Sequence, residues 1–112
     1  MPMESLNQEI DHFVGQVVSR FNPERIILFG SHAKGQTSTD SDVDLLVIMD
    51  YEGRPHEKAF EIRKEIPRKF PLDLLVRRQK EIDRRLQMND LFFKEIILKG
   101  KTLYERTGGR MV

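Results

Sequence analysis

The stretch FGSHAKGQTSTDSDVDLLVIMD, residues 29–50, carries most of the information in this chain about its fold and its chemistry. A Gly-Ser pair at 30–31 follows an apolar run, and a polar segment leads from it to a second apolar run, Val43–Met49, which is predicted to be a buried strand. Asp42 and Asp44 flank the first valine of that run. Because side chains alternate along a strand, the two carboxylates are predicted to point to the same side.

Two neighbouring carboxylates repel each other unless one takes a proton or a cation lies between them. Mg²⁺ prefers oxygen ligands and commonly combines one or two carboxylates with substrate phosphates. Gly30 and Ser31 complement such a site, because a glycine lets backbone N–H groups approach a phosphate and serine adds a hydroxyl donor. The stretch therefore predicts a metal and phosphate site at the ends of two strands.

A third carboxylate, Asp73, interrupts the apolar run Leu72–Val76. The apolar residues of this run lie on one face of the predicted strand, so Asp73 lies on the other. If this strand neighbours the one that carries Asp44, the carboxylates meet, and three of them can hold two metal ions about 3.5–4 Å apart for attack of a hydroxyl on phosphorus. Taken singly, a Gly-Ser pair is usually a turn and an Asp-x-Asp pair is usually loop charge, so the prediction depends on their occurring together.

Length and composition exclude several classes of protein. The chain has 112 residues, which predicts a single domain over 1–112 without room for a separate substrate-binding domain. Its 19 basic and 18 acidic residues nearly cancel, so charge does not favour a nucleic-acid partner. The absence of cysteine excludes a disulfide framework, a thiol nucleophile and a zinc-thiolate site. No apolar run approaches the ~20 residues that span a bilayer, so we expect a cytoplasmic protein without a membrane partner.

Helical and strand patterns alternate along the rest of the chain, which predicts an α/β (α+β) domain with a central mixed sheet flanked by helices. Helices are expected near 5–21 with Ser5 as the N-cap, at 55–66, at 79–88, and at 89–99 with Asn89 as the N-cap. Strands are expected at 26–29, 43–49, 72–76 and, at a sheet edge, 102–104. A helical turn is expected at 31–35 and a polar loop at 36–41.

The block GSHAKGQTSTDSDVDLLV, residues 30–47, resembles the signature of the nucleotidyltransferase superfamily related to DNA polymerase beta. The short chain and the downstream Asp73 look most like the minimal nucleotidyltransferases, and the resemblance extends from the first predicted helix to GKTLYER at 100–106. One departure is Lys34, where the family often has arginine. Lysine keeps the charge but gives up bidentate contact with a phosphate.

The resemblance implies the nucleotidyltransferase fold and a reaction that uses two Mg²⁺ ions. Asp42 and Asp44 would bind both ions, and Asp73 would bind the ion that activates the attacking hydroxyl. The β- and γ-phosphates of a nucleoside triphosphate would bind at Gly30 and Ser31, with help from Lys34. The reaction implied is transfer of a nucleoside monophosphate, AMP from ATP being the most common choice, with release of pyrophosphate.

Some minimal nucleotidyltransferases are antitoxins that modify a tyrosine of a helical HEPN-type toxin, and the resemblance favours such a protein adenylyltransferase here. Two alternatives stay open: an antibiotic-type enzyme acting on a small molecule, and a non-catalytic antitoxin that neutralises its partner by contact. Both homo- and hetero-oligomers are compatible with the sequence. His32 and the basic cluster Arg77, Arg78, Lys80, Arg84 and Arg85 either contact substrate or form ordinary solvated surface.

The segment DLFFKEIILK, residues 90–99, predicts a helix with two apolar sides. One side would pack on the sheet and consists of Phe92, Phe93, Ile96 and Ile97. Leu91 and Leu98 lie together on another side. Either the segment 79–88 covers them or they bind a partner, and we favour the partner because so short a chain leaves substrate recognition incomplete.

Overall fold

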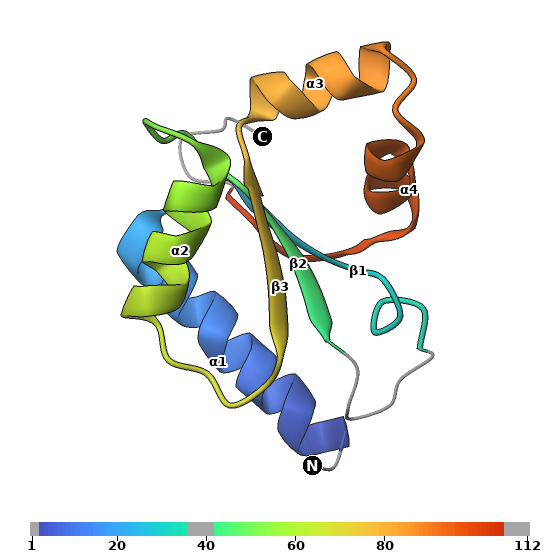
Figure 1. Cartoon of the computed structure of the whole chain (residues 1–112). Coiled ribbons are helices and arrows are strands. Elements are labelled where there is room, and N and C mark those ends of the chain that lie inside the picture. Colours follow the sequence, from blue (N-terminus) through green and yellow to red (C-terminus); the bar gives the residue numbers. More distant parts are fainter. Residues whose placement is uncertain (1–2, 36–41, 107–112) are drawn as a thin grey trace.

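The computed structural model describes residues 3–35 and 42–106, which form a four-stranded mixed sheet with helices on both faces (Figure 1). The helices are α1 (Met3–Phe21), α2 (Pro55–Glu65), α3 (Gln79–Gln87) and α4 (Leu91–Lys99). The strands are β1 (Arg25–Phe29), β2 (Val43–Ile48), β3 (Leu72–Arg77) and β4 (Lys101–Glu105), in the spatial order β3-β2-β1-β4. This confirms the predicted fold class. The loop expected at 36–41 lies outside the described residues.

The central strand β2 is antiparallel to β1 and parallel to β3. A parallel neighbour requires a crossover connection, and α2 supplies it between β2 and β3. The register places Asp44 opposite Phe29 of β1 on one side and opposite Asp73 of β3 on the other. The topology therefore brings a strand end from each of three segments to one place.

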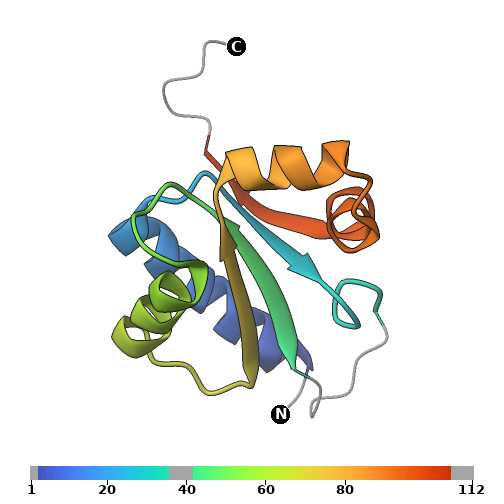
Figure 2. The same ribbon diagram turned by 45° about the horizontal axis from the view of Figure 1, so that its top comes forward.

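Alternation along the strands divides the core into two layers (Figure 2). One layer lies between the sheet and helices α1 and α2, and it contains Val43, Leu45 and Val47 of β2. The other lies under α3 and α4 and contains Leu46 and Ile48. Asp44 is the one polar residue of β2, and its position in the alternation puts it on the α3 and α4 side of the sheet.

Two predicted helix caps are wrong. Helix α1 begins at Met3, so Ser5 lies inside the helix. Helix α4 is capped by Asp90, whose side chain accepts a hydrogen bond from the Phe93 N–H at 3.2 Å. Asn89 instead adopts a left-handed φ of 61° in the turn after α3, a conformation that asparagine tolerates better than most residues. The other predicted boundaries agree closely with the structure.

None of the helices in the described part of the chain is long and apolar enough to cross a membrane.

Candidate active site

Asp44 and Asp73 form the centre of the candidate site. They are register partners on parallel neighbouring strands, which lie about 4.8 Å apart, and both point to the α3 and α4 side of the sheet. Asp44 is half-buried and Asp73 is exposed at the edge of the sheet. The structure thus brings together two carboxylates that lie far apart in the sequence.

Electrostatics shows how closely these carboxylates interact. Burial raises the pKa of Asp44, and the negative charges of Asp73 and Asp42 raise this pKa further. A side-chain hydrogen bond between Asp44 and Asp73 acts in the same direction, while His32 lowers the pKa. Neighbouring carboxylates that raise each other's pKa in this way are an arrangement that a cation between them would stabilise.

The turn after β1 packs directly against Asp44. Gly30 has a left-handed φ of 76°, and a Cβ atom built on it would collide with Oδ2 of Asp44. The Lys34 N–H closes the turn on the carbonyls of Gly30 and Ser31 at 3.3 and 3.2 Å. Only glycine meets both demands, because it has no Cβ and adopts a positive φ without strain. Ser31 and His32 lie half-buried in the same turn.

Asp42 precedes β2 and is exposed. The negative charge of Asp42 contributes to the raised pKa of Asp44. However, the residues described by the structure contain no group of three or more acidic, His or Cys side chains that could hold a metal ion. The donor set nevertheless fits Mg²⁺, which takes oxygen ligands and often binds one or two carboxylates together with substrate phosphates. A bound triphosphate would therefore have to complete the coordination.

A pocket of about 190 Å³ adjoins the turn, and the sequence analysis did not predict it. Phe29, Gly30 and Lys34 line it on one side, and Phe92 and Lys99 of α4 line it on the other. Phe92 was expected in the core, but its side chain is 52% exposed. Its ring packs edge to face against that of Phe29, with 5.9 Å between the ring centroids. An aromatic residue immediately before the Gly-Ser pair was the available signal.

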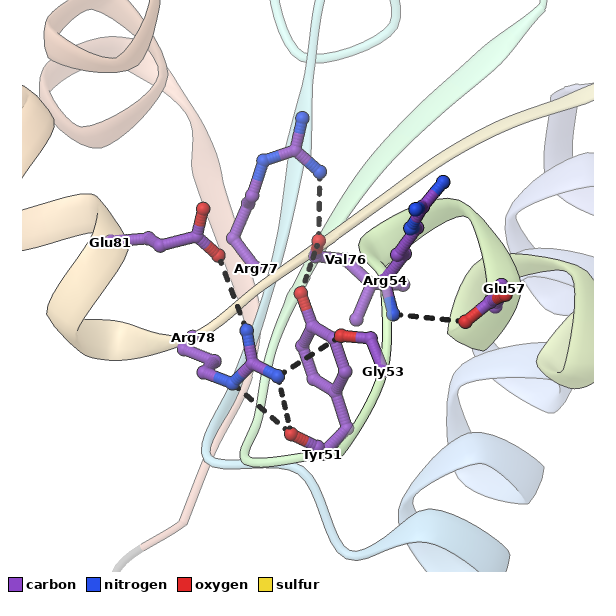
Figure 3. Close-up of polar contacts among 8 residues, drawn as sticks. All are labelled: Tyr51, Gly53, Arg54, Glu57, Val76, Arg77, Arg78 and Glu81. Carbon is purple, nitrogen blue, oxygen red and sulfur yellow. Dashed lines mark hydrogen bonds and ion pairs between the residues drawn. The ribbon is translucent and has the colours of Figure 1, made fainter.

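Part of the predicted basic cluster has a structural role (Figure 3). The Arg78 guanidinium donates to the carbonyls of Tyr51 and Gly53, at 2.7 and 3.2 Å, and lies 4.1 Å from the centre of the Tyr51 ring. It also forms an ion pair with Glu81 at 3.8 Å. Arg78 therefore holds the connection after β2 against the start of α3.

Comparison with known proteins gives two matches, one to a family and one to a solved structure. The sequence profile of the family described as polymerase beta, nucleotidyltransferase matches residues 13–108. The structure also matches the crystal structure of a Sulfolobus solfataricus protein that is provisionally assigned as a nucleotidyltransferase. The match has a TM-score of 0.64 at 21% sequence identity and covers 94% of this chain and 85% of that one. At this identity the structural match supports the fold alone. No curated protein matches the chain.

Proposed function

Because the chain belongs to the nucleotidyltransferase family related to DNA polymerase beta, we propose that it transfers AMP from ATP to a hydroxyl group of a partner protein. The observation that carries the proposal is the contact between the Gly30 turn and the Asp44–Asp73 pair. A backbone turn suited to phosphate and carboxylates suited to cations are thereby held side by side.

In the proposed reaction, the Gly30 and Ser31 N–H groups and the Ser31 hydroxyl hold the β- and γ-phosphates. Asp42, Asp44 and Asp73 would hold two Mg²⁺ ions, which neutralise phosphate charge and lower the pKa of the attacking hydroxyl. The hydroxyl releases its proton to water, its oxygen bonds to the α-phosphorus, the bond from that phosphorus to the bridging oxygen breaks, and pyrophosphate leaves.

The unequal exposure of the two central carboxylates supports separate roles for them. Asp44 is half-buried against the Gly30 turn, so we assign it to the side of the site that would hold the phosphates. Asp73 is exposed on the edge strand β3, which makes it accessible to a hydroxyl from a large acceptor. The neighbouring pocket, lined by Phe29 and Phe92, offers the rest of the nucleotide an apolar surface, and Lys34, Glu95 and Lys99 are the charged residues of its lining.

Exposed apolar residues on the α3–α4 hairpin support a protein partner. The side chains of Leu91 and Leu98 are 73% and 72% exposed, so the alternative that the segment 79–88 covers them is wrong. Met88, at the end of α3, is 63% exposed. Such clustered apolar exposure favours an interaction site, and we assign it to a helical toxin of the HEPN type, with this chain as its cytoplasmic antitoxin.

The test is to incubate the protein with Mg²⁺, each of the four nucleoside triphosphates in turn, and the product of the neighbouring gene, and to follow that product by intact-mass spectrometry. The proposal predicts the addition of one nucleoside monophosphate, most readily AMP. Transfer to an aminoglycoside instead would establish the antibiotic-type alternative. A stable complex that never gains mass would establish the non-catalytic one.

A further inference from the structure

A second, larger groove of about 860 Å³ runs along the junction of α2 and β3, apart from the pocket beside Gly30. Four cationic side chains line it: Arg63, Lys64, Arg68 and Arg77. None of its lining residues is acidic, and none of the ion pairs found among the described residues involves these four. The side chain of Phe60 beside them is 67% exposed. The groove therefore combines unpaired positive charge with apolar surface.

The positive charge of Arg68 has no acidic partner among the described residues. Its Nε atom is buried without a hydrogen-bond partner. Burial lowers the pKa of Arg68, and the positive charge of neighbouring Arg63 lowers this pKa further. Because a buried donor without an acceptor is costly, an anionic group bound between Arg63 and Arg68 would relieve both the unmet hydrogen bond and the repulsion.

The groove is lined by an edge strand of the sheet, because in the part of the chain that the structure describes β3 pairs with β2 alone. The carbonyls of Pro71 and Arg77 accept hydrogen bonds from β2 and the residue after it, at 2.9 and 3.0 Å. Since backbone groups alternate in direction along a strand, those of Leu74 and Val76 point away from β2.

Arg77 and Tyr51 already donate hydrogen bonds to one of these outward-pointing backbone groups, the carbonyl of Val76. The Val76 carbonyl accepts from Nη1 of Arg77 at 2.8 Å and from the Tyr51 hydroxyl at 3.4 Å (Figure 3). An added strand therefore cannot pair with the Val76 carbonyl, at the Arg77 end of β3. No hydrogen bond found among the described residues uses the N–H or C=O of Leu74 or the N–H of Val76, so these groups are left for an added strand.

We propose that this groove binds an acidic, extended segment of the acceptor protein as a further strand beside β3. Carboxylates of the segment would pair with Arg63 and Arg68, and its apolar residues would cover Phe60. Single-stranded nucleic acid would use the cations but would leave the strand edge unpaired, so the backbone geometry favours a peptide.

The groove also has a useful position relative to the candidate site, and this part of the inference rests on the proposed function. It extends along β3 from Leu74 to Arg77, and Asp73 is the next residue of the same strand. At about 3.3 Å per residue, a hydroxyl side chain two to four residues from the docked stretch would reach Asp73. The groove would thus select an acceptor hydroxyl that has acidic residues close to it in sequence.

The direct test uses a short fluorescein-labelled peptide that alternates acidic residues with valine, and measures its binding by anisotropy in the absence of nucleotide. The Arg63→Glu, Arg68→Glu double variant should bind at least about tenfold more weakly than the wild type. The control is Lys80→Glu, Arg84→Glu, which makes the same change of charge on exposed residues of α3 and should bind normally. An equal loss of peptide affinity in the two double variants would overturn the proposal, as would a failure of the peptide to bind the wild type.

Pairing as a strand is tested on the wild-type protein, which removes any dependence on the folding of a variant. N-methylation of one alternate set of peptide amides should abolish binding, while methylation of the other set should be tolerated. In NMR spectra, the amide signals of Leu74 and Val76 should shift on addition of the peptide. Strand addition would be contradicted if both N-methylated peptides bound as tightly as the unmethylated one. It would also be contradicted if a short RNA displaced the peptide without shifting the amide signals of Leu74 and Val76.

A final arm separates this inference from the proposed function. A tyrosine is placed at successive positions beyond the acidic stretch, and AMP transfer to it is measured with MgATP. Binding at the groove without transfer at any position refutes the link to Asp73 but leaves the docking groove in place. Transfer to the toxin that is unaffected by Arg63→Glu, Arg68→Glu would instead support the proposed function and refute the groove as its docking site.

Discussion

Substitution of Gly30 by alanine tests the contact on which the candidate site depends. Alanine at the φ of 76° found there costs about 1–2 kcal/mol of folding free energy, because the left-handed region crowds a Cβ atom against the backbone. The new methyl group would also collide with Oδ2 of Asp44 and lie 3.1 Å from its Cγ, so the Asp44 side chain must leave its present position beside Asp73. We expect MgATP binding to weaken about 10–100-fold, the usual effect of misplacing a metal ligand through its neighbours.

Gly35 provides the matched control. Its φ of 75° is almost the same, yet a Cβ atom built on it meets no atom of the described residues within 4 Å. Gly35→Ala should therefore lose a similar 1–2 kcal/mol, about the cost of the backbone conformation alone, and keep its affinity for MgATP. Urea denaturation measures the first quantity and isothermal titration the second. If Gly30→Ala binds MgATP as tightly as Gly35→Ala does, the turn does not position Asp44 and the reasoning fails.

Three further predictions concern single features of the molecule. Burial and the negative charges of Asp73 and Asp42 raise the pKa of Asp44 above its ordinary value of 3.8, so ionisation of this side chain destabilises the fold. Asp44→Asn should match the wild type below about pH 3.8 and become the more stable of the two as pH rises, which thermal melts in EDTA would show. The same variant should lose nucleotide transfer, and retained transfer would remove Asp44 from the mechanism. Ser31→Ala should weaken triphosphate binding by about 0.5–3 kcal/mol, whereas an unchanged affinity in titration would make Ser31 a turn residue only. The Leu91→Asp, Leu98→Asp variant should change stability by no more than about 0.5 kcal/mol for each substitution, because both side chains are exposed, and should fail to co-purify with its partner; continued co-purification would place the partner elsewhere.

The fold was largely predictable because periodicity and turn residues act locally. The apolar run of β2 and the helical spacing of α1 each specify an element within a short window, and strand alternation correctly assigned Asp73 to the face opposite Leu72 and Leu74. The caps were harder to predict, since Asn89 and Asp90 are both good N-caps and the turn from α3 decides between them.

The candidate site was predictable only where it depends on local sequence. The Gly-Ser pair and the carboxylates are visible along the chain, but the partnership of Asp44 with Asp73 depends on a crossover that no spacing specifies. The pocket beside Gly30 depends on where α4 lies over the sheet, and helical periodicity alone assigned Phe92 to the core. The groove along β3 depends on strand order, which makes β3 an edge.

The central claim is that the Asp44–Asp73 pair supports metal-dependent transfer of the α-phosphoryl group. The most direct measurement compares ATP labelled at the α-phosphate with ATP labelled at the γ-phosphate, using the wild type, Asp44→Asn and the product of the neighbouring gene. We predict that the α-label alone moves to that protein, that the γ-label leaves as pyrophosphate, and that EDTA or Asp44→Asn abolishes both. Transfer of the γ-label, or α-label transfer that survives in Asp44→Asn, would contradict the account.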